Sequence, residues 1–137
     1  MSNLTLSYLE TEGEDFGVLC ASVETADFSG RGRACVQWHD VEAFAANLLA
    51  YSLLDEPPVL RCGFNEGQGD DLIVSVEVKP ADSRGGLTVS VEIADHVKPT
   101  RRVRADFRSH YSELAAFQNA LMQKGRGEVE EAVLAGE

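Results

Sequence analysis

Two segments, Leu72-Ile73-Val74-Ser75-Val76-Glu77-Val78 and Leu87-Thr88-Val89-Ser90-Val91-Glu92-Ile93, decide the fold of this 137-residue chain. In both, apolar residues occupy every second position and mostly polar residues stand between them. A period of two is typical of strands that bury one face of an antiparallel sheet. The segment between them, 79–86, is rich in turn-forming residues, so the two strands are predicted to form a hairpin.

A third strand is predicted over 102–108, with Val103, Ala105 and Phe107 on its inner face. The apolar spacing then changes to three or four residues, which indicates one face of a helix, formed by Tyr111, Leu114, Phe117 and Leu121. Ser109 or Ser112 is expected to cap this helix, because a serine oxygen accepts a bond from a free backbone N–H.

The first half of the chain follows the same order. Three strands are predicted from the apolar sets Leu4, Leu6 and Tyr8, then Phe16, Val18 and Cys20, then Phe28, Ala34 and Val36. A helix follows, capped by Asp40, with an apolar face of Val41, Phe44, Leu48 and Leu49. Pro57 and Pro58 prevent its continuation, and another strand is predicted from Val59 to Phe64.

The two halves look duplicated. Arg31-Gly32-Arg33-Ala34 matches Arg102-Val103-Arg104-Ala105, and a two-residue shift then matches the apolar faces of the two helices. Chance similarity between two strand–helix junctions is the alternative. We predict a single α+β domain over 1–137, with βββα halves at about 1–58 and 59–124. Residues 125–137 form either a frayed acidic tail or a short edge strand.

The expected architecture is one antiparallel sheet, or two half-sheets, with both amphipathic helices covering the apolar face. Trp38, at the junction of the third strand and the first helix, is expected in the core.

The balance of charge is strongly acidic, with a formal net charge of −11. Such a chain repels nucleic acid phosphates and attracts basic partners, although many cytosolic proteins are simply acidic. The N-terminus lacks the pattern of a secretory signal, and apolar stretches fall short of the ~20 residues of a membrane span. Three cysteines without a CxxC pair indicate reduced, mostly buried thiols. We therefore expect a cytoplasmic protein.

Sequence motifs for catalysis are missing, so the chain is not expected to be an enzyme. There is no GxSxG turn and no phosphate-binding loop. His39 and His110 are expected just before the two helices, with Asp40 and Asp106 nearby, but two histidines without a third fixed ligand are a poor metal signal. Structural histidines are the preferred reading, and neither metal nor cofactor is expected.

Charges are segregated along the chain. Lys98, Arg101, Arg102, Arg104 and Arg108 are five of the twelve basic residues. Cross-strand pairing of these arginines with Glu77 and Glu92 on the outer sheet face is expected. The acidic surplus then remains for a partner, and the predicted partner-binding surface consists of Glu12, Glu14, Asp15, Asp55, Glu56, Asp70 and Asp71.

The strand–helix junctions and the C-terminus resemble the WapI-type immunity proteins. The likeness covers most of the chain and lies in Trp38 with Val41 to Phe44 and Leu48, in His110-Tyr111 with Leu114, Phe117 and Leu121, and in Gly127 to Gly136. It implies a cytosolic antidote that binds and blocks the catalytic domain of a secreted toxin. The long loops at 67–71 and 79–86 depart from the pattern and leave the toxin partner open.

The leading hypothesis is therefore a non-catalytic protein-binding domain, of which an immunity protein is the specific form. One alternative is a small-molecule or metal-binding enzyme that uses His39 and His110. Another is a structural protein whose exposed edge strands pair into a homodimer.

Overall fold

The computed structural model describes residues 2–10, 16–48, 57–63, 72–81, 84–95, 98, 100–124 and 131–137. Within these ranges the chain forms eight strands and two helices, and the predicted α+β class is confirmed. In chain order they are β1 (Ser2–Glu10), β2 (Phe16–Glu24), β3 (Ser29–Gln37), α1 (Trp38–Leu48), β4 (Val59–Gly63), β5 (Leu72–Pro80), β6 (Gly86–Ala94), β7 (Arg102–His110), α2 (Tyr111–Lys124) and β8 (Ala132–Gly136).

The strands form two antiparallel sheets of four strands each. The first sheet has the order β3-β2-β1-β8, and the second has the order β4-β5-β6-β7. The predicted hairpin is present, since β5 pairs with β6 and Val76 lies opposite Val91. At the C-terminus, β8 pairs with β1 and places Leu134 opposite Leu4. The C-terminal segment thus ends as an edge strand of the first sheet.

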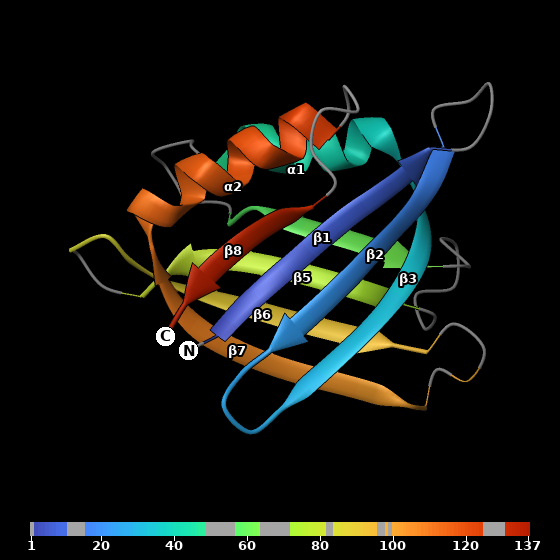
Figure 1. Ribbon diagram of the computed structural model, residues 1–137, viewed down its shortest axis with the longest axis horizontal. Coiled ribbons are helices and arrows are strands. Elements are labelled where there is room, and N and C mark those ends of the chain that lie inside the picture. Colours follow the sequence, from blue (N-terminus) through green and yellow to red (C-terminus); the bar gives the residue numbers. More distant parts are fainter. Residues whose placement is uncertain are drawn as a thin grey trace.

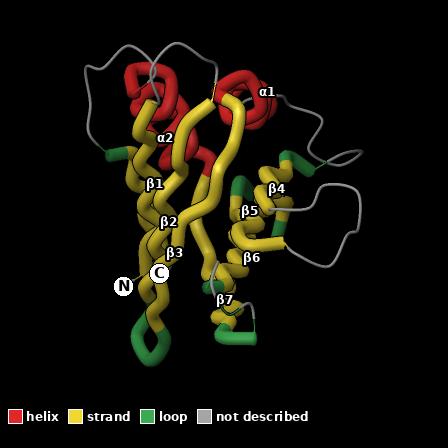
Figure 2. Tube along the Cα trace, turned by 90° about the vertical axis from the view of Figure 1, so that its right-hand side faces the viewer, coloured by secondary structure: helices red, strands yellow, loops and turns green. Residues whose placement is uncertain are grey.

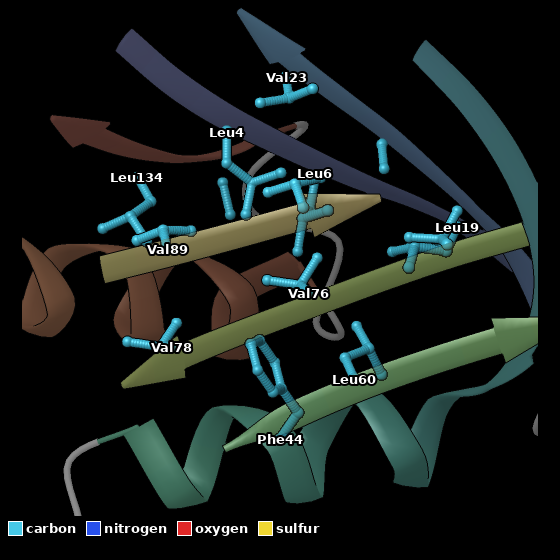
Figure 3. Packing of buried hydrophobic residues seen from close by; sticks show 14 of the residues in the cluster. Leu4, Leu6, Leu19, Val23, Phe44, Leu60, Val76, Val78, Val89 and Leu134 are labelled. Carbon is cyan, nitrogen blue, oxygen red and sulfur yellow. The ribbon is translucent and has the colours of Figure 1, made fainter. Parts of the chain in front are cut away.

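The two sheets lie face to face, and both helices lie across one end of the pair (Figures 1 and 2). Buried side chains from both sheets form one core, in which Leu4 and Leu134 of the first sheet lie beside Val89 of the second (Figure 3). Of the two architectures expected, the structure has the half-sheets. The helices do not cover a sheet face, because each sheet has an alternating apolar face and the two faces cover each other.

The helices pack against each other and extend the core. Phe44 of α1 and Phe117 of α2 are buried, and Gln118 Nε2 donates a hydrogen bond to the carbonyl oxygen of Ala45 at 2.9 Å. Trp38 is partly buried against this core, with its ring centroid 5.0 Å from that of Tyr8. The expectation that Trp38 is a core residue is therefore confirmed.

Neither predicted N-cap is found, because each helix starts directly at the end of a strand. Asp40 lies inside the first turn of α1, where a carboxylate is still favourable beside the free N–H groups. Ser109 belongs to β7, and its hydroxyl donates to the carbonyl oxygen of Ala135 at 2.6 Å. It therefore ties β8 to the second sheet instead of capping α2, which contains Ser112.

The two sheets are repeats of each other once β8 is counted with the first. From one edge the elements follow the order β8-β1-β2-β3-α1 in the first and β4-β5-β6-β7-α2 in the second. The strand registers extend this match from β3 and β7 through β2 and β6 to β1 and β5. The buried residues of β1 then match buried residues of β5, namely Leu4, Leu6 and Tyr8 with Val74, Val76 and Val78. Each repeat has four strands instead of the predicted three, and the C-terminus supplies the fourth strand of the first.

The alignment of the repeats differs from the sequence prediction. β3 and β7 have nine residues each and both continue directly into a helix. Aligning these junctions matches Arg31 with Arg104, and the same offset matches Val41 with Leu114. The predicted match of Arg31 with Arg102 was two residues out. A shift of two keeps every side chain on its face, so alternation alone could not reveal the error.

Two assignments in the first half were wrong. In β2 the buried residues are Leu19, Ala21 and Val23, whereas Val18 and Cys20 lie half-buried on the other face. The residues on both faces of β2 are small or apolar, so the alternation did not indicate which face is buried. Phe28 is not an inward strand residue but lies 66% exposed in the turn before β3. Its backbone N–H donates to Thr25 Oγ1 at 3.1 Å in that turn.

Glycines allow β3 to approach the second sheet closely. A Cβ at Gly30 would lie 2.7 Å from Val103 Cγ2, and one at Gly32 would lie 2.6 Å from Ile93 Cγ2. Both distances are below ordinary van der Waals contact, so no other residue fits without movement of β6 or β7. This approach fixes β3 at the side of the sheet pair, with Arg31 and Arg33 facing outward.

Candidate functional site

The acidic surface predicted from the sequence lies outside the described residues. This applies to each of its seven members, Glu12, Glu14, Asp15, Asp55, Glu56, Asp70 and Asp71. The structure therefore does not show where these carboxylates lie, and the acidic partner-binding surface stays a prediction.

The structure does not bring the two histidines together. His39 is the second residue of α1, its side chain is 60% exposed, and its Nε2 lies 3.3 Å from Asp40 Oδ1. His110 is the exposed last residue of β7. The junction of β3 with α1 lies at the right of Figure 1, and that of β7 with α2 lies at the left. Among the described residues, no group of three or more His, Cys, Asp or Glu side chains could hold a metal ion.

A broad hollow of about 990 Å³ lies against the outer face of the first sheet and extends past β3 to the end of the second sheet. Its floor consists of short side chains because the outward positions of β1 and β2 carry Thr5, Ser7, Cys20 and Ser22. They are half-buried, although they face outward, since the twisted sheet curves around them. The floor supplies hydroxyl and thiol groups that donate and accept hydrogen bonds.

The strand registers order these side chains into two rows. In the first row Thr5 lies opposite Ser22, which lies opposite Arg31. In the second row Ser7 lies opposite Cys20, which lies opposite Arg33. Each row therefore crosses three strands and ends on an exposed guanidinium group of β3.

On the opposite side the lining of the hollow includes Glu131, and Val133 of β8 lies next to the floor on the same outer face. Val133 lies opposite Thr5 and is 47% exposed. One edge of the floor is thus positively charged, and the other combines an apolar side chain with a carboxylate.

More arginines line the hollow where it reaches the second sheet. Arg101 Nη1 lies 3.5 Å from Asp95 Oδ2, and Arg102 Nη1 lies 3.1 Å from Glu92 Oε1. Both arginines are thus engaged with carboxylates, unlike Arg31 and Arg33, which have no ion-pair or hydrogen-bond partner within the described parts of the chain.

The expected cross-strand pairing of the arginine cluster is partly confirmed. Glu92 binds Arg102 and also Arg104, whose Nη2 lies 3.4 Å from the same oxygen. Glu77 is instead 3.9 Å from Lys79 on its own strand. β7 is paired with β6, so its arginines reach Glu92 first.

Sequence reasoning did not select Arg31 and Arg33 as site residues. Alternation with Ala34 and Val36 puts both arginines on the outward face of the third strand, but many solvated charges have such a position. The missing signal was which β2 residues lie across the register: Arg31 lies opposite Ser22 and Arg33 lies opposite Cys20, whereas the outward carboxylate of β2, Glu24, lies opposite Ser29. The pattern on β2 had been assigned to the wrong face.

The cysteines differ in their environments. Cys62 is 3% exposed, and burial, assisted by the nearby Asp40 carboxylate, raises the pKa of its thiol to about 12. Cys20 is half-buried in the floor of the hollow. The prediction of buried thiols is therefore confirmed for Cys62 and only in part for Cys20. The side chain of Cys35 lies outside the described part of the chain.

No helix in the described part of the chain is long and apolar enough to cross a membrane. No protein-family model, curated protein or solved structure matches this chain.

Proposed function

We propose that this chain is a non-catalytic protein-binding domain that uses the outer face of its first sheet. The observation that carries the proposal is the hollow of about 990 Å³ with a floor of short polar side chains and exposed arginines at one edge. Small-molecule sites enclose most of their ligand. This floor instead extends across strands as an open surface, which is the shape that a protein segment can cover.

The immunity-type function implied by the sequence resemblance is the specific form of this proposal. Its support is the formal net charge of −11, which attracts a basic toxin domain from a distance and raises the association rate. At physiological ionic strength this attraction extends over roughly 8 Å. The arginines of the hollow act within contact distance, so they can select an acidic segment on a partner that is basic as a whole.

The repeats supply a matched test of the binding face. Thr5 on the first sheet and Ser75 on the second occupy equivalent outward positions. Thr5→Trp fills the hollow, whereas Ser75→Trp places the same bulk on the other sheet. The immobilised wild-type chain and both variants are exposed to host lysate, and captured proteins are identified by mass spectrometry.

We expect a protein captured by the wild type and by Ser75→Trp to be lost with Thr5→Trp. A folded Thr5→Trp variant that captures the same proteins would refute the proposed face. Circular dichroism of both variants establishes that they are folded. A captured secreted multidomain protein, with binding by its basic domain, would support the antidote form.

A further inference from the structure

The equivalent outward positions of the two sheets carry opposite net charges. The hollow of the first sheet contains Thr5, Ser7, Cys20, Ser22, Arg31 and Arg33. The equivalent residues of the second sheet line a smaller hollow of about 290 Å³ and are Ser75, Glu77, Ser90, Glu92, Arg104 and Asp106. The first set has two positive charges and no negative charge, and the second has one positive and three negative. At these equivalent positions, carboxylates are therefore present on the second sheet only.

This difference leaves an arginine without the partner that its counterpart has. Arg104 lies opposite Glu92 on β6, and the two form an ion pair at 3.4 Å. Arg31 lies opposite Ser22 on β2, and a serine hydroxyl cannot neutralise a guanidinium group. Arg33, two residues further along β3, lies opposite Cys20. In a protein with a net charge of −11, this is a local concentration of positive charge that no carboxylate among the described residues neutralises.

Resting on the proposed function, we propose that Arg31 and Arg33 bind an acidic segment of the partner protein in extended conformation. Residues two apart on a strand are separated by about 6.6 Å. An extended peptide repeats its side chains on one face at the same interval, so carboxylates at alternate positions match the two guanidinium groups. Arginine binds carboxylates with paired, charge-assisted hydrogen bonds. Ser22 and Cys20 lie beside this track for polar contacts, and Ser7 lies one strand further.

Charge and shape favour this occupant over others. Nucleic acid would meet the repulsion of the whole acidic chain. A small anion would satisfy one arginine and leave most of the hollow open, because the floor continues across β2 to β1. A segment with alternating acidic residues contacts both arginines at once, and it can belong to a larger partner surface that extends over the floor.

The test uses an eight-residue peptide of alternating glutamate and threonine, labelled for fluorescence anisotropy, and a control peptide of alternating glutamine and threonine. We expect the acidic peptide alone to bind, more weakly at higher salt. Arg31→Ser and Arg33→Ser should each weaken its binding about two- to fivefold, the range for an exposed ion pair. The matched control is Arg61→Ser, which removes an exposed arginine from β4 and should leave the binding unchanged.

A second variant closes the site without removing an arginine. Ser22→Glu restores the carboxylate that Glu92 provides in the other sheet and should pair with Arg31, so acidic-peptide binding should fall. Asn47→Glu adds the same charge at an exposed position of α1 and is the control for the change in net charge. If both variants weaken acidic-peptide binding to the same extent, the proposal is overturned, because the effect then depends on net charge and not on the position of the new carboxylate.

Competitors distinguish the remaining occupants. Tighter, arginine-dependent binding of inorganic phosphate or of a single-stranded oligonucleotide would overturn the peptide proposal, as would equal binding of the glutamine peptide. If the acidic peptide fails to bind while Thr5→Trp still abolishes capture from lysate, the inference about partner chemistry is wrong and the proposed function stands. If peptide binding follows the arginines but capture survives Thr5→Trp, the proposed function is the part that fails.

Discussion

Replacement of Leu134 by alanine tests whether the C-terminal strand is a part of the core. Leu134 is fully buried, lies opposite Leu4 in the register of β8 with β1, and sits beside Val89 of the other sheet (Figure 3). Truncation of a buried leucine removes its burial and leaves a cavity, which lowers the free energy of unfolding by about 2–5 kcal/mol. We expect a value in the upper half of that range, because the site is enclosed by both sheets.

The matched control is Val133→Ala, one residue earlier on the same strand. Val133 is 47% exposed on the outer face, so its truncation should change the free energy of unfolding by less than about 0.5 kcal/mol. Urea unfolding followed by circular dichroism measures both variants. With a slope of about 1–3 kcal/mol per molar for small proteins, a loss in that upper half should lower the midpoint by about 1–5 M. Equal midpoints for the two variants would refute the docking of β8.

Four further predictions concern the same fold. Gly136→Ala should lower the free energy of unfolding by about 1–3 kcal/mol, because the new Cβ meets the carbonyl oxygen of Arg108 and the ring of Phe107; unfolding in urea measures it, and wild-type stability would contradict the close approach. The pKa of about 12 for Cys62, against 9.0 for an ordinary thiol, means that the folded state prefers the neutral form. The contribution of the Cys62 thiol to the free energy of unfolding should be complete below pH 9 and fall by about 3 kcal/mol by pH 11. The free energy of unfolding of Cys62→Val should therefore decrease less than that of the wild type between these pH values. Parallel decreases would contradict this expectation. In the Cys35→Ser chain at pH 8, iodoacetamide should modify Cys20 before Cys62, as peptide mass spectrometry would show; the reverse order would contradict their burial. Finally, Ser2 pairs with Gly136, so a chain with joined termini and new ends within 64–71 should fold with wild-type circular dichroism, and an unfolded product would contradict the adjacency of the termini.

The strands of the second sheet could be predicted because their sequence alternates without ambiguity. In β5 and β6, valine, leucine and isoleucine alternate with mostly polar residues, and the structure buries each member of the predicted set whose side chain it describes, all except Leu72. In β2 both faces carry small or apolar side chains, so Val18 and Cys20 were chosen where Leu19 and Ala21 are buried. Alternation specifies a strand in both cases, but it specifies the buried face only where the other face is polar.

The pairing of β8 with β1 connects the two ends of the chain, and sequence periodicity carries no information about such distant partners. The two alternatives for 125–137 therefore stayed open until the structure placed Ala132 and Leu134 in the core. The face-to-face arrangement of the sheets was one of two expected architectures for the same reason. Local apolar patterns predict the strands and helices, whereas the packing of these elements depends on which apolar faces contact each other.

The candidate site was missed because it is defined by an absent carboxylate. Arg31 and Arg104 share the same outward position in equivalent strands, and only the residue across the register, Ser22 or Glu92, distinguishes a free guanidinium group from a paired one. That comparison requires the correct alignment of the repeats, which the strand–helix junctions provide. The predicted acidic surface lies outside the described residues, so its contribution remains a prediction.

The central claim is that the outer face of the first sheet binds a partner and the equivalent face of the second sheet does not. The most direct measurement places a photo-crosslinking amino acid at position 20 or at the equivalent position 90, and irradiates each folded chain in host lysate. We expect a specific protein adduct from position 20 alone. Adducts of equal yield from both positions, or an adduct from position 90 alone, would contradict the claim.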